Sequence, residues 1–342
     1  MIPTNLEALT PLLLAVILLA VFFDYVNGFH DTANAIATSV ATRALRPAYA
    51  IAMATAFNFI GAFAGTAVAK TIGSGLVDDQ TTTLTIVAAA LIGAIAWNLI
   101  TWWLGLPSSS SHALIGGLLG ATIVGAGWRA LKVGDLQSGI IGKVIVPLVT
   151  SPILGFAIAL ILMVGLYWLF RGAERKPLAR IFRRLQVFSA GYMAFAHGSN
   201  DAQKTMGIIT LGLFSAGVIS DNTVPPWVIL IAASAISLGT AIGGWRIMKT
   251  MGQKVTALEP VQGFAAETTG ASIILGAAHL GMPVSTTHVI SSAIMGVGTS
   301  RGARHVRWGV ARDILTAWVL TIPAAGLIGA AAWWILTALG IT

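Results

Sequence analysis

Long apolar runs make up most of this chain, and short polar stretches separate them. The runs are long enough to cross the hydrocarbon core of a bilayer as helices. The alternating pattern that is typical of membrane β-strands does not occur. The sequence therefore predicts an all-α polytopic membrane protein, with helical segments near 9–27, 47–69, 83–104, 107–127, 139–170, 226–248, 260–280, 284–299 and 308–340.

Two polar stretches are expected to break membrane helices. The first lies near Gly28, where the helix 9–27 meets a further helical piece that reaches about 44. The second covers 197–204 and precedes a short helix that ends near 219. Each stretch places a glycine beside an acidic residue, and such broken helices often line the substrate cavity of transporters with internal repeats.

A Pro-Ser motif occurs twice. Residues 105–112 read Gly-Leu-Pro-Ser-Ser-Ser-Ser-His, and residues 281–288 read Gly-Met-Pro-Val-Ser-Thr-Thr-His. Ser and Thr are favourable N-caps, and a helix N-terminus attracts anions through its free N–H groups. Each copy alone is explained by capping, but two equivalent copies favour a shared site for a tetrahedral oxyanion. The candidate ligands are Ser109, Ser110, Ser111, Ser285, Thr286 and Thr287.

The acidic stretches and the Pro-Ser motifs occur in the same order in both halves. Asp31 and Asp201 are 170 residues apart, and His112 and His288 are 176 residues apart. Two markers at nearly the same shift predict two homologous repeats with a site between them. Whether the repeats are inverted depends on the number of crossings in each half, which the pattern leaves open.

Charged residues make up only 9% of the chain, far below the share in soluble proteins. The net charge of +8 comes from basic residues in short loops, which favours cytoplasmic retention of those loops over nucleic-acid binding. We expect an arginine-rich cytoplasmic loop at 171–184 between transmembrane repeats at 1–170 and 185–342. The lack of cysteine excludes disulfides and thiolate metal sites.

An ionisable group inside a membrane costs at least about 2.5–3.5 kcal/mol, so each needs a partner or a function. Asp31 with Asn34 offers oxygen ligands for a hard cation such as Na⁺, whereas Asp201 with Lys204 offers an ion pair. Buried structural salt bridges are the alternative, and the matching places of the two aspartates make it weaker. Glu267 lies within an apolar span and is a further functional candidate.

The histidines allow two interpretations. His112 and His288 end the two Pro-Ser motifs, where each would donate to the anion, carry a coupling proton or orient its own loop. His30 and His197 flank the acidic stretches with the same ambiguity. Asp24 lies close to the predicted end of the first helix, where a structural role fits as well as a functional one.

At these residues the chain resembles the inorganic phosphate transporter (PiT) family, most closely its bacterial low-affinity branch. The resemblance rests on two acidic signatures, Gly28-Phe29-His30-Asp31-Thr32-Ala33-Asn34-Ala35 and Gly198-Ser199-Asn200-Asp201-Ala202-Gln203-Lys204, and on the two Pro-Ser motifs. It implies an inverted-repeat helical fold with re-entrant hairpins around phosphate, and a homodimer. It also implies that Asp31, Asn34 and Asp201 bind substrate or coupling cation, and that Glu267 matches a family glutamate.

Lys204 departs from the family pattern, which would place asparagine there, as at Asn34. A lysine supplies a fixed charge near the anion or replaces a bound Na⁺. We therefore place Gln203 and Lys204 with the substrate ligands, and Glu267, His112 and His288 with the coupling residues. The expected coupling ion is H⁺, with phosphate carried alone or as a metal complex, and Na⁺ is the alternative. No resident cofactor is expected.

The sequence thus predicts a secondary transporter that imports inorganic phosphate across a prokaryotic plasma membrane, and not an enzyme. A sulfate or other oxyanion permease is the nearest alternative, because the size and shape of the anion are similar. An anion channel would use the same paired helix N-termini. An intramembrane hydrolase with Ser and His is disfavoured, because the Ser-His unit is duplicated and no Gly-x-Ser-x-Gly elbow occurs.

Overall fold

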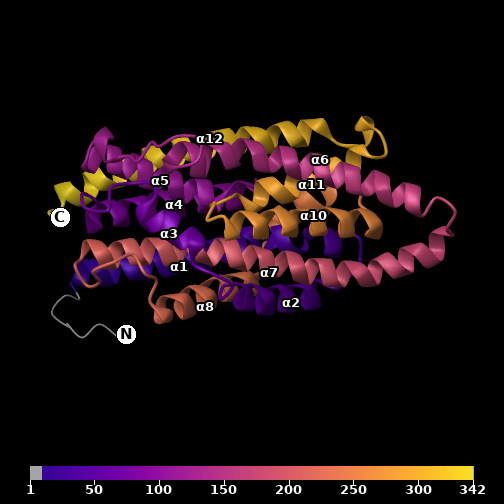
Figure 1. The fold of residues 1–342 in the computed structure, drawn as a ribbon, viewed down its shortest axis with the longest axis horizontal. Coiled ribbons are helices and arrows are strands. Elements are labelled where there is room, and N and C mark those ends of the chain that lie inside the picture. The colour runs from indigo at the N-terminus through magenta and orange to yellow at the C-terminus, as the bar shows by residue number, and fades with distance from the viewer. Residues whose placement is uncertain (1–9, 342) are drawn as a thin grey trace.

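The computed structural model describes residues 10–341, which form helices along a common long axis (Figure 1). The α-helices are α1 (Pro11–Ala41), α2 (Pro47–Gly61), α3 (Ala67–Ser74), α4 (Leu84–Leu104), α5 (Ser110–Gly125), α6 (Val146–Leu169), α7 (Arg175–Ser215), α8 (Pro226–Ile242), α9 (Trp245–Lys249), α10 (Pro260–His279), α11 (Thr286–Thr299) and α12 (Trp308–Ala338). Two π-helical segments, Ile141–Ile145 and Thr250–Lys254, adjoin α6 and α9.

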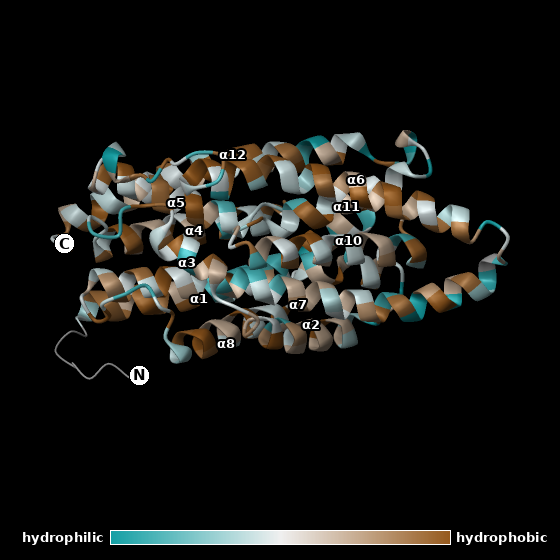
Figure 2. Ribbon diagram, in the orientation of Figure 1, coloured by the Kyte–Doolittle hydropathy of each residue, from teal (hydrophilic) through white to brown (hydrophobic). Residues whose placement is uncertain are grey.

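Among residues 10–341, four helices are long and apolar enough to cross a membrane: α1, α4, α12 and the continuous segment Ile141–Leu169. The pair Pro226–Ile242 and Trp245–Lys254, bent by 60°, would add a fifth. Figure 2 shows hydrophobic ribbon over most of the molecule and hydrophilic stretches midway along its length. The prediction of an all-α polytopic membrane protein is therefore confirmed.

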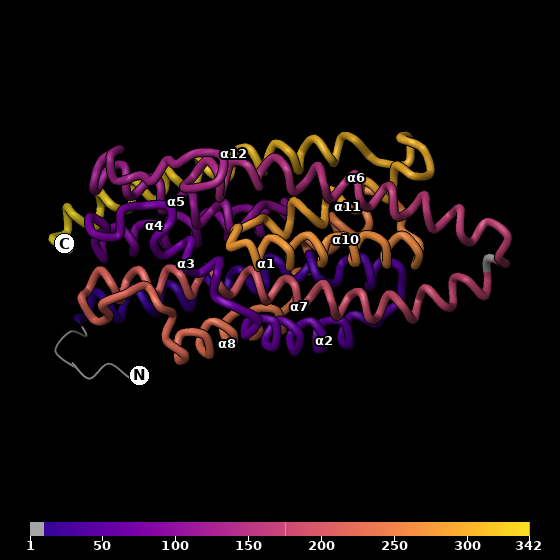
Figure 3. Tube along the Cα trace, in the orientation of Figure 1, coloured from indigo at the N-terminus to yellow at the C-terminus, as the bar shows by residue number. Residues whose placement is uncertain are grey.

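The order of elements is the same in both halves. Helix α1, the pair α2 and α3, the hairpin α4–α5 and helix α6 are followed by α7, the pair α8 and α9, the hairpin α10–α11 and helix α12. Along the view of Figure 3, α1 and α7 run in opposite directions, and so do α6 and α12. These two pairs of helices, each with one member in either half, are therefore antiparallel in the structure.

The predicted breaks at Gly28 and at 197–204 are wrong, because α1 and α7 run through both positions as continuous helices. The glycines serve close packing instead. A Cβ atom on Gly28 would meet the carbonyl oxygen of Ile236 on α8, and one on Gly198 would meet that of Asn58 on α2. Side chains would force these helices apart, so the glycines are explained without any opening of the backbone.

Three other segments differ from the sequence-based boundaries. The region 47–69 divides into α2 and α3, and 226–248 bends between α8 and α9. Residues from Arg175 onward belong to α7, so the connection between the halves is shorter than the predicted 171–184 loop. The helices expected at 83–104 and 260–280 agree with α4 and α10 to within one residue.

Elements of one half pack mainly on elements of the other. Helix α1 packs on α8, and α7 packs on α2. Helix α12 covers the hairpin α4–α5, while α6 covers α11 and contacts α10. The two halves are interlocked in the packed structure.

Two apolar cores meet at the middle of α1 and α7. Phe29 belongs to the first cluster of buried apolar residues and Ala33 to the second. On α7 the change comes between Ala196 and Ala202. Asp31 and Asp201 lie at these two boundaries, so both buried aspartates are found where the two apolar cores meet.

Candidate functional site

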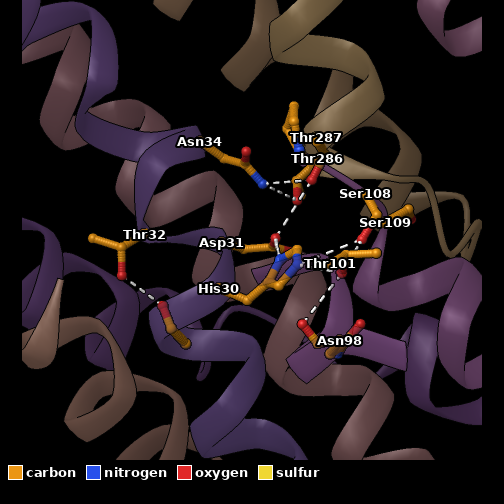
Figure 4. Close-up of polar contacts among 12 residues, drawn as sticks. His30, Asp31, Thr32, Asn34, Asn98, Thr101, Ser108, Ser109, Thr286 and Thr287 are labelled. Carbon is orange, nitrogen blue, oxygen red and sulfur yellow. Dashed lines mark hydrogen bonds and ion pairs between the residues drawn. The ribbon is translucent and has the colours of Figure 1, made fainter. Parts of the chain in front are cut away.

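The first acidic signature presents its polar side chains on one face of α1, because Asp31, Asn34 and Thr38 are three and four residues apart. All three are buried. His30 Nδ1 lies 2.7 Å from Asp31 Oδ1, and its Nε2 lies 3.0 Å from the hydroxyl of Thr101 on α4 (Figure 4). His30 thus links the carboxylate to the hairpin α4–α5.

Asn34 joins the first half to the motif of the second half. Its amide donates to Thr286 Oγ1 at 3.2 Å and to Thr287 Oγ1 at 2.8 Å (Figure 4). The Thr287 hydroxyl also donates to Asp31 Oδ1 at 3.5 Å. Residues of the first acidic signature and of the distant second Pro-Ser motif therefore lie in contact.

The second acidic signature balances its charge within α7. Lys204 Nζ donates to Asp201 Oδ1 at 2.6 Å, and both side chains are fully buried. His197 Nε2 lies 3.5 Å from Asp201 Oδ2, and its Nδ1 lies 3.1 Å from Asn58 Oδ1 on α2. Because the aspartate already faces an ammonium group, its negative charge is largely compensated.

Gln203 has a different surrounding from the other candidates. Its Oε1 accepts from the backbone N–H of Val68 at 2.8 Å and of Ala69 at 3.4 Å, near the start of α3. Its Nε2 donates to the carbonyl oxygen of Ser199. Both ends of the carboxamide are engaged, so the side chain anchors α3 to α7.

Asp31, His197 and Asp201 converge from α1 and α7, with one ligand atom of each within 4.8 Å of the others. Carboxylate oxygens suit hard cations, and imidazole suits transition metals. The ammonium of Lys204, 2.6 Å from Asp201, opposes a further cation at that carboxylate. This geometry suits a proton or a single monovalent ion better than a divalent metal.

The two Pro-Ser motifs have the same local geometry. Gly105 and Gly281 turn the chain with φ of 66° and 65°, a region that glycine adopts without steric cost. Ser109 then caps α5 by accepting from the N–H of His112 at 3.2 Å, and Ser285 caps α11 by accepting from the N–H of His288 at 3.2 Å. The sequence-based N-caps are confirmed in both copies.

The tips of the hairpins α4–α5 and α10–α11 meet. The hydroxyl of Ser111 donates to the carbonyl oxygen of Val284 at 3.3 Å. The ring centroids of His112 and His288 lie 4.7 Å apart, and His288 stacks on Trp318 of α12 at 3.8 Å. Two helix N-termini, each with its positive dipole end, therefore approach one buried region.

Several polar atoms of this region have no hydrogen-bond partner among residues 10–341. They are Asn34 Oδ1, Ser110 Oγ, His112 Nδ1 and both ring nitrogens of His288. Buried polar groups are nearly always paired, so unpaired ones at converging helix N-termini indicate a place for a ligand. Hydroxyl, imidazole and backbone N–H donors fit an oxyanion.

Glu267 lies apart from the hairpin tips. Its Oε1 accepts from Thr38 at 2.5 Å and from Gln186 at 3.2 Å, and its Oε2 accepts from Ser189 at 2.5 Å. These three donors hold the carboxyl of α10 between α1 and α7. Glu267 therefore links α10 to α1 and α7 and does not lie at the hairpin tips.

Sequence reasoning missed several partners of the site. Thr101 and Ser108 lie beside His30, and Asn58 contacts His197. Gln186 and Ser189 bind Glu267. The available signal was an isolated polar residue inside an apolar helix, which is costly unless it pairs with something.

Comparison with known proteins gives consistent matches. The profile of the phosphate transporter family matches residues 27–329. A probable low-affinity inorganic phosphate transporter of Bacillus subtilis is 47% identical over 97% of this chain and 99% of its own length. One of Rhizobium meliloti is 50% identical over 94% and 95%. A solved sodium-dependent phosphate transporter is 25% identical, with a TM-score of 0.83 over 96% of this chain and 100% of its own. These relatives are transporters, which confirms the prediction that the chain is not an enzyme.

Proposed function

The chain belongs to the phosphate transporter family, and from that premise we propose that it imports inorganic phosphate by symport with a cation. The observation that carries the proposal is that the capped N-termini of α5 and α11 converge on a buried region where several polar side-chain atoms have no hydrogen-bond partner in the described chain. Such a cradle suits a tetrahedral oxyanion. The hydroxyls of Ser110, Ser111, Thr286 and Thr287 would line it.

The coupling ion we favour is H⁺. The ammonium of Lys204 lies against Asp201 in the position where the first half has the neutral Asn34, so it supplies a positive charge that a bound Na⁺ would otherwise supply. The structural neighbour is a sodium-dependent transporter, which keeps Na⁺ as the alternative. Asp31 and His197 complete the proposed coupling site, and a divalent metal would travel with phosphate as a complex rather than as a resident cofactor.

The proposed mechanism is alternating access with phosphate bound between inverted repeats. Opposite directions of α1 and α7 support the inversion. The hairpins α4–α5 and α10–α11 would be re-entrant, each bringing its capped tip to the middle of the membrane. We place the protein in a prokaryotic plasma membrane as a homodimer in contact with lipid, with the segment near 171–174 on the cytoplasmic side because of the basic residues around it.

Uptake of radiolabelled phosphate into proteoliposomes tests the proposal. A pH gradient alone should drive accumulation, and a Na⁺ gradient alone should not. Addition of Mg²⁺ tests transport of a metal complex, and excess sulfate should not compete. Full activity with a Na⁺ gradient and no response to pH would refute H⁺ coupling, whereas equal competition by sulfate would refute phosphate as the specific substrate.

A further inference from the structure

A groove lies along α3 and ends at the hairpin α10–α11. Its volume is about 350 Å³, and the residues that line it come from the segments 67–75 and 279–281. None of these residues is among the proposed ligands of phosphate. Gly281, at the inner end of the groove, is the first residue of the second Pro-Ser motif. The groove therefore reaches the start of the segment that carries the cap Ser285.

The groove extends from the level of the buried aspartates toward one end of the molecule. The first turn of α3 lies at that level, because the N–H of Val68 donates to Gln203, two residues after Asp201 on α7. The eight residues of α3 then span about 12 Å. Beyond them, Asp79 accepts from Asn222, in the connection that follows α7. Because α7 begins at the α6–α7 connection, the groove runs toward the opposite end.

Exposed backbone beside the groove requires water at this depth. Residues 63–66, between α2 and α3, are non-helical and exposed. Inside a membrane, non-helical backbone is tolerated only where it lines water or is buried in protein, since lipid cannot satisfy its polar groups. A water-filled groove along α3 supplies that environment.

Three basic side chains surround the inner end of the groove. Lys70 and His279 line it, and both are exposed. Lys143 donates from its Nζ to the carbonyl oxygen of Leu280 at 3.3 Å. Nδ1 of His279 lies 2.9 Å from the carbonyl oxygen of Leu275 and must donate to it, which leaves Nε2 for another partner. In the described part of the chain no acidic residue lines the groove, so its electrostatic field favours anions.

A hydrogen bond holds α3 against the hairpin turn at the inner end of the groove. The hydroxyl of Thr71 donates to the carbonyl oxygen of Gly281 at 2.7 Å. On α9, Thr250 makes the corresponding bond to Gly105 at 3.1 Å. The groove beside Lys249, however, is lined by residues of α1, α9 and the adjoining π-helical segment. Of these two grooves, the one along α3 is the one that reaches a hairpin turn.

We propose that the groove along α3 is an entry site for phosphate, in which Lys70, Lys143 and His279 hold the anion before it reaches the hairpins. The inference rests on the proposed function. In the orientation proposed above, the groove faces away from the cytoplasm, which is the side from which an importer takes its substrate. The two ammonium groups raise the local concentration of the anion, and Nε2 of His279 offers it a hydrogen bond. A phospholipid headgroup has the same chemistry, and the experiment separates the two sources.

The variant Lys70→Cys tests the charge directly, because the chain has no native cysteine. The full chain is reconstituted in phosphatidylcholine vesicles that are preloaded with unlabelled phosphate, and initial uptake of radiolabelled phosphate is measured at low ionic strength. KM should rise by about threefold with kcat unchanged, as expected for the loss of one charge near the anion in water. At about 1 M salt the difference should disappear, because the Debye length falls to about 3 Å.

Charged thiol reagents sharpen the test. A membrane-impermeant methanethiosulfonate that carries a trimethylammonium group should restore the KM of Lys70→Cys, and one that carries a sulfonate group should raise it further. Both reach only molecules whose groove faces outward. Lys143→Cys should show the same pattern and carries the test if Lys70→Cys does not fold. Arg129→Cys is the matched control, because Arg129 is an exposed cation at the same end and does not line the groove. Its KM should stay at the wild-type value with either reagent.

Four results would overturn the assignment. The first is an unchanged KM at low ionic strength in both lysine variants. The second is an equal effect of the two reagents, which would show that bulk and not charge matters. The third is a thiol that neither reagent modifies, which would mean that the groove is closed to water. The fourth is an effect that appears only when phosphatidylglycerol is added to the vesicles, which would assign the groove to a lipid headgroup. Wild-type protein that does not exchange phosphate would instead refute the proposed function.

Discussion

The two halves of the molecule place an aspartate at equivalent positions and then treat the next helical turn differently. In the first half, Asn34 reaches across to the hydroxyls of Thr286 and Thr287. In the second half, Lys204 folds back onto Asp201 at 2.6 Å. The neutral amide of Asn34 does not compensate the negative charge of Asp31, whereas the ammonium of Lys204 compensates that of Asp201 within the same helix. The scaffold is shared by both halves, and the charge balance at its centre is set separately in each.

Removing the first-half charge should have the largest effect. In Asp31→Asn, phosphate uptake should fall by about 100-fold or more, since hydrogen bonds to a charged group contribute about 1.5–3 kcal/mol and the coupling site loses its carboxylate. Initial uptake rates in proteoliposomes measure this. Asp313→Asn, on the exposed surface of α12, should transport normally. Near-normal uptake by Asp31→Asn would exclude it from the site.

Giving the second half the residue of the first should have the next largest effect. Lys204→Asn leaves Asp201 buried without its cation, which costs about 3–5 kcal/mol unless another cation replaces it. We expect pH-driven accumulation to disappear and Na⁺, but not a large organic cation, to raise the thermal unfolding temperature. Lys249→Asn, at an exposed lysine of α9, is the control. A variant insensitive to Na⁺ would show that Lys204 does not occupy a cation position.

The smallest effects should come from the two caps, and they should be equal. Ser109→Ala and Ser285→Ala each remove a side-chain acceptor at the start of a helix, which costs about 1 kcal/mol. If both helix starts contact phosphate, KM should rise by about fivefold in each variant with kcat little changed. Ser151→Ala, which removes a buried hydroxyl from α6, should leave KM unaltered. A large effect in only one of the pair would mean that the anion is held by a single hairpin.

Features that depend on neighbours in the sequence could be predicted. Capping of a helix by a Ser or Thr of each Pro-Ser motif needs only a few consecutive residues, and the structure places these caps at Ser109 and Ser285. The Asp201–Lys204 pair is likewise local, because the two residues are one turn apart. The long apolar helices also followed, since length and composition alone identify them.

Features that depend on distant partners could not be predicted. A glycine in an apolar segment is consistent with a helix break or with close packing of two helices. For Gly28 the reason is close packing against the backbone of Ile236, which belongs to the other half. The same error misplaced Asp24. A helix end expected near residue 27 puts Asp24 close to that end, whereas in the structure Asp24 is buried inside the continuous helix α1. The contacts of His30 with Thr101 and of His197 with Asn58 are equally distant in sequence.

The cross-packing of the halves has a consequence for biosynthesis. Gly28 finds its partner on α8, and the hairpin α4–α5 finds its cover in α12, the final helix. During translation the first half therefore enters the bilayer before the surfaces that complete it exist. Until the last helix is made, the buried acids, amides and hydroxyls of the first half lack these partners and must be hydrated by water or held by insertion factors. The proposed substrate site is for this reason completed only after α12 has been made.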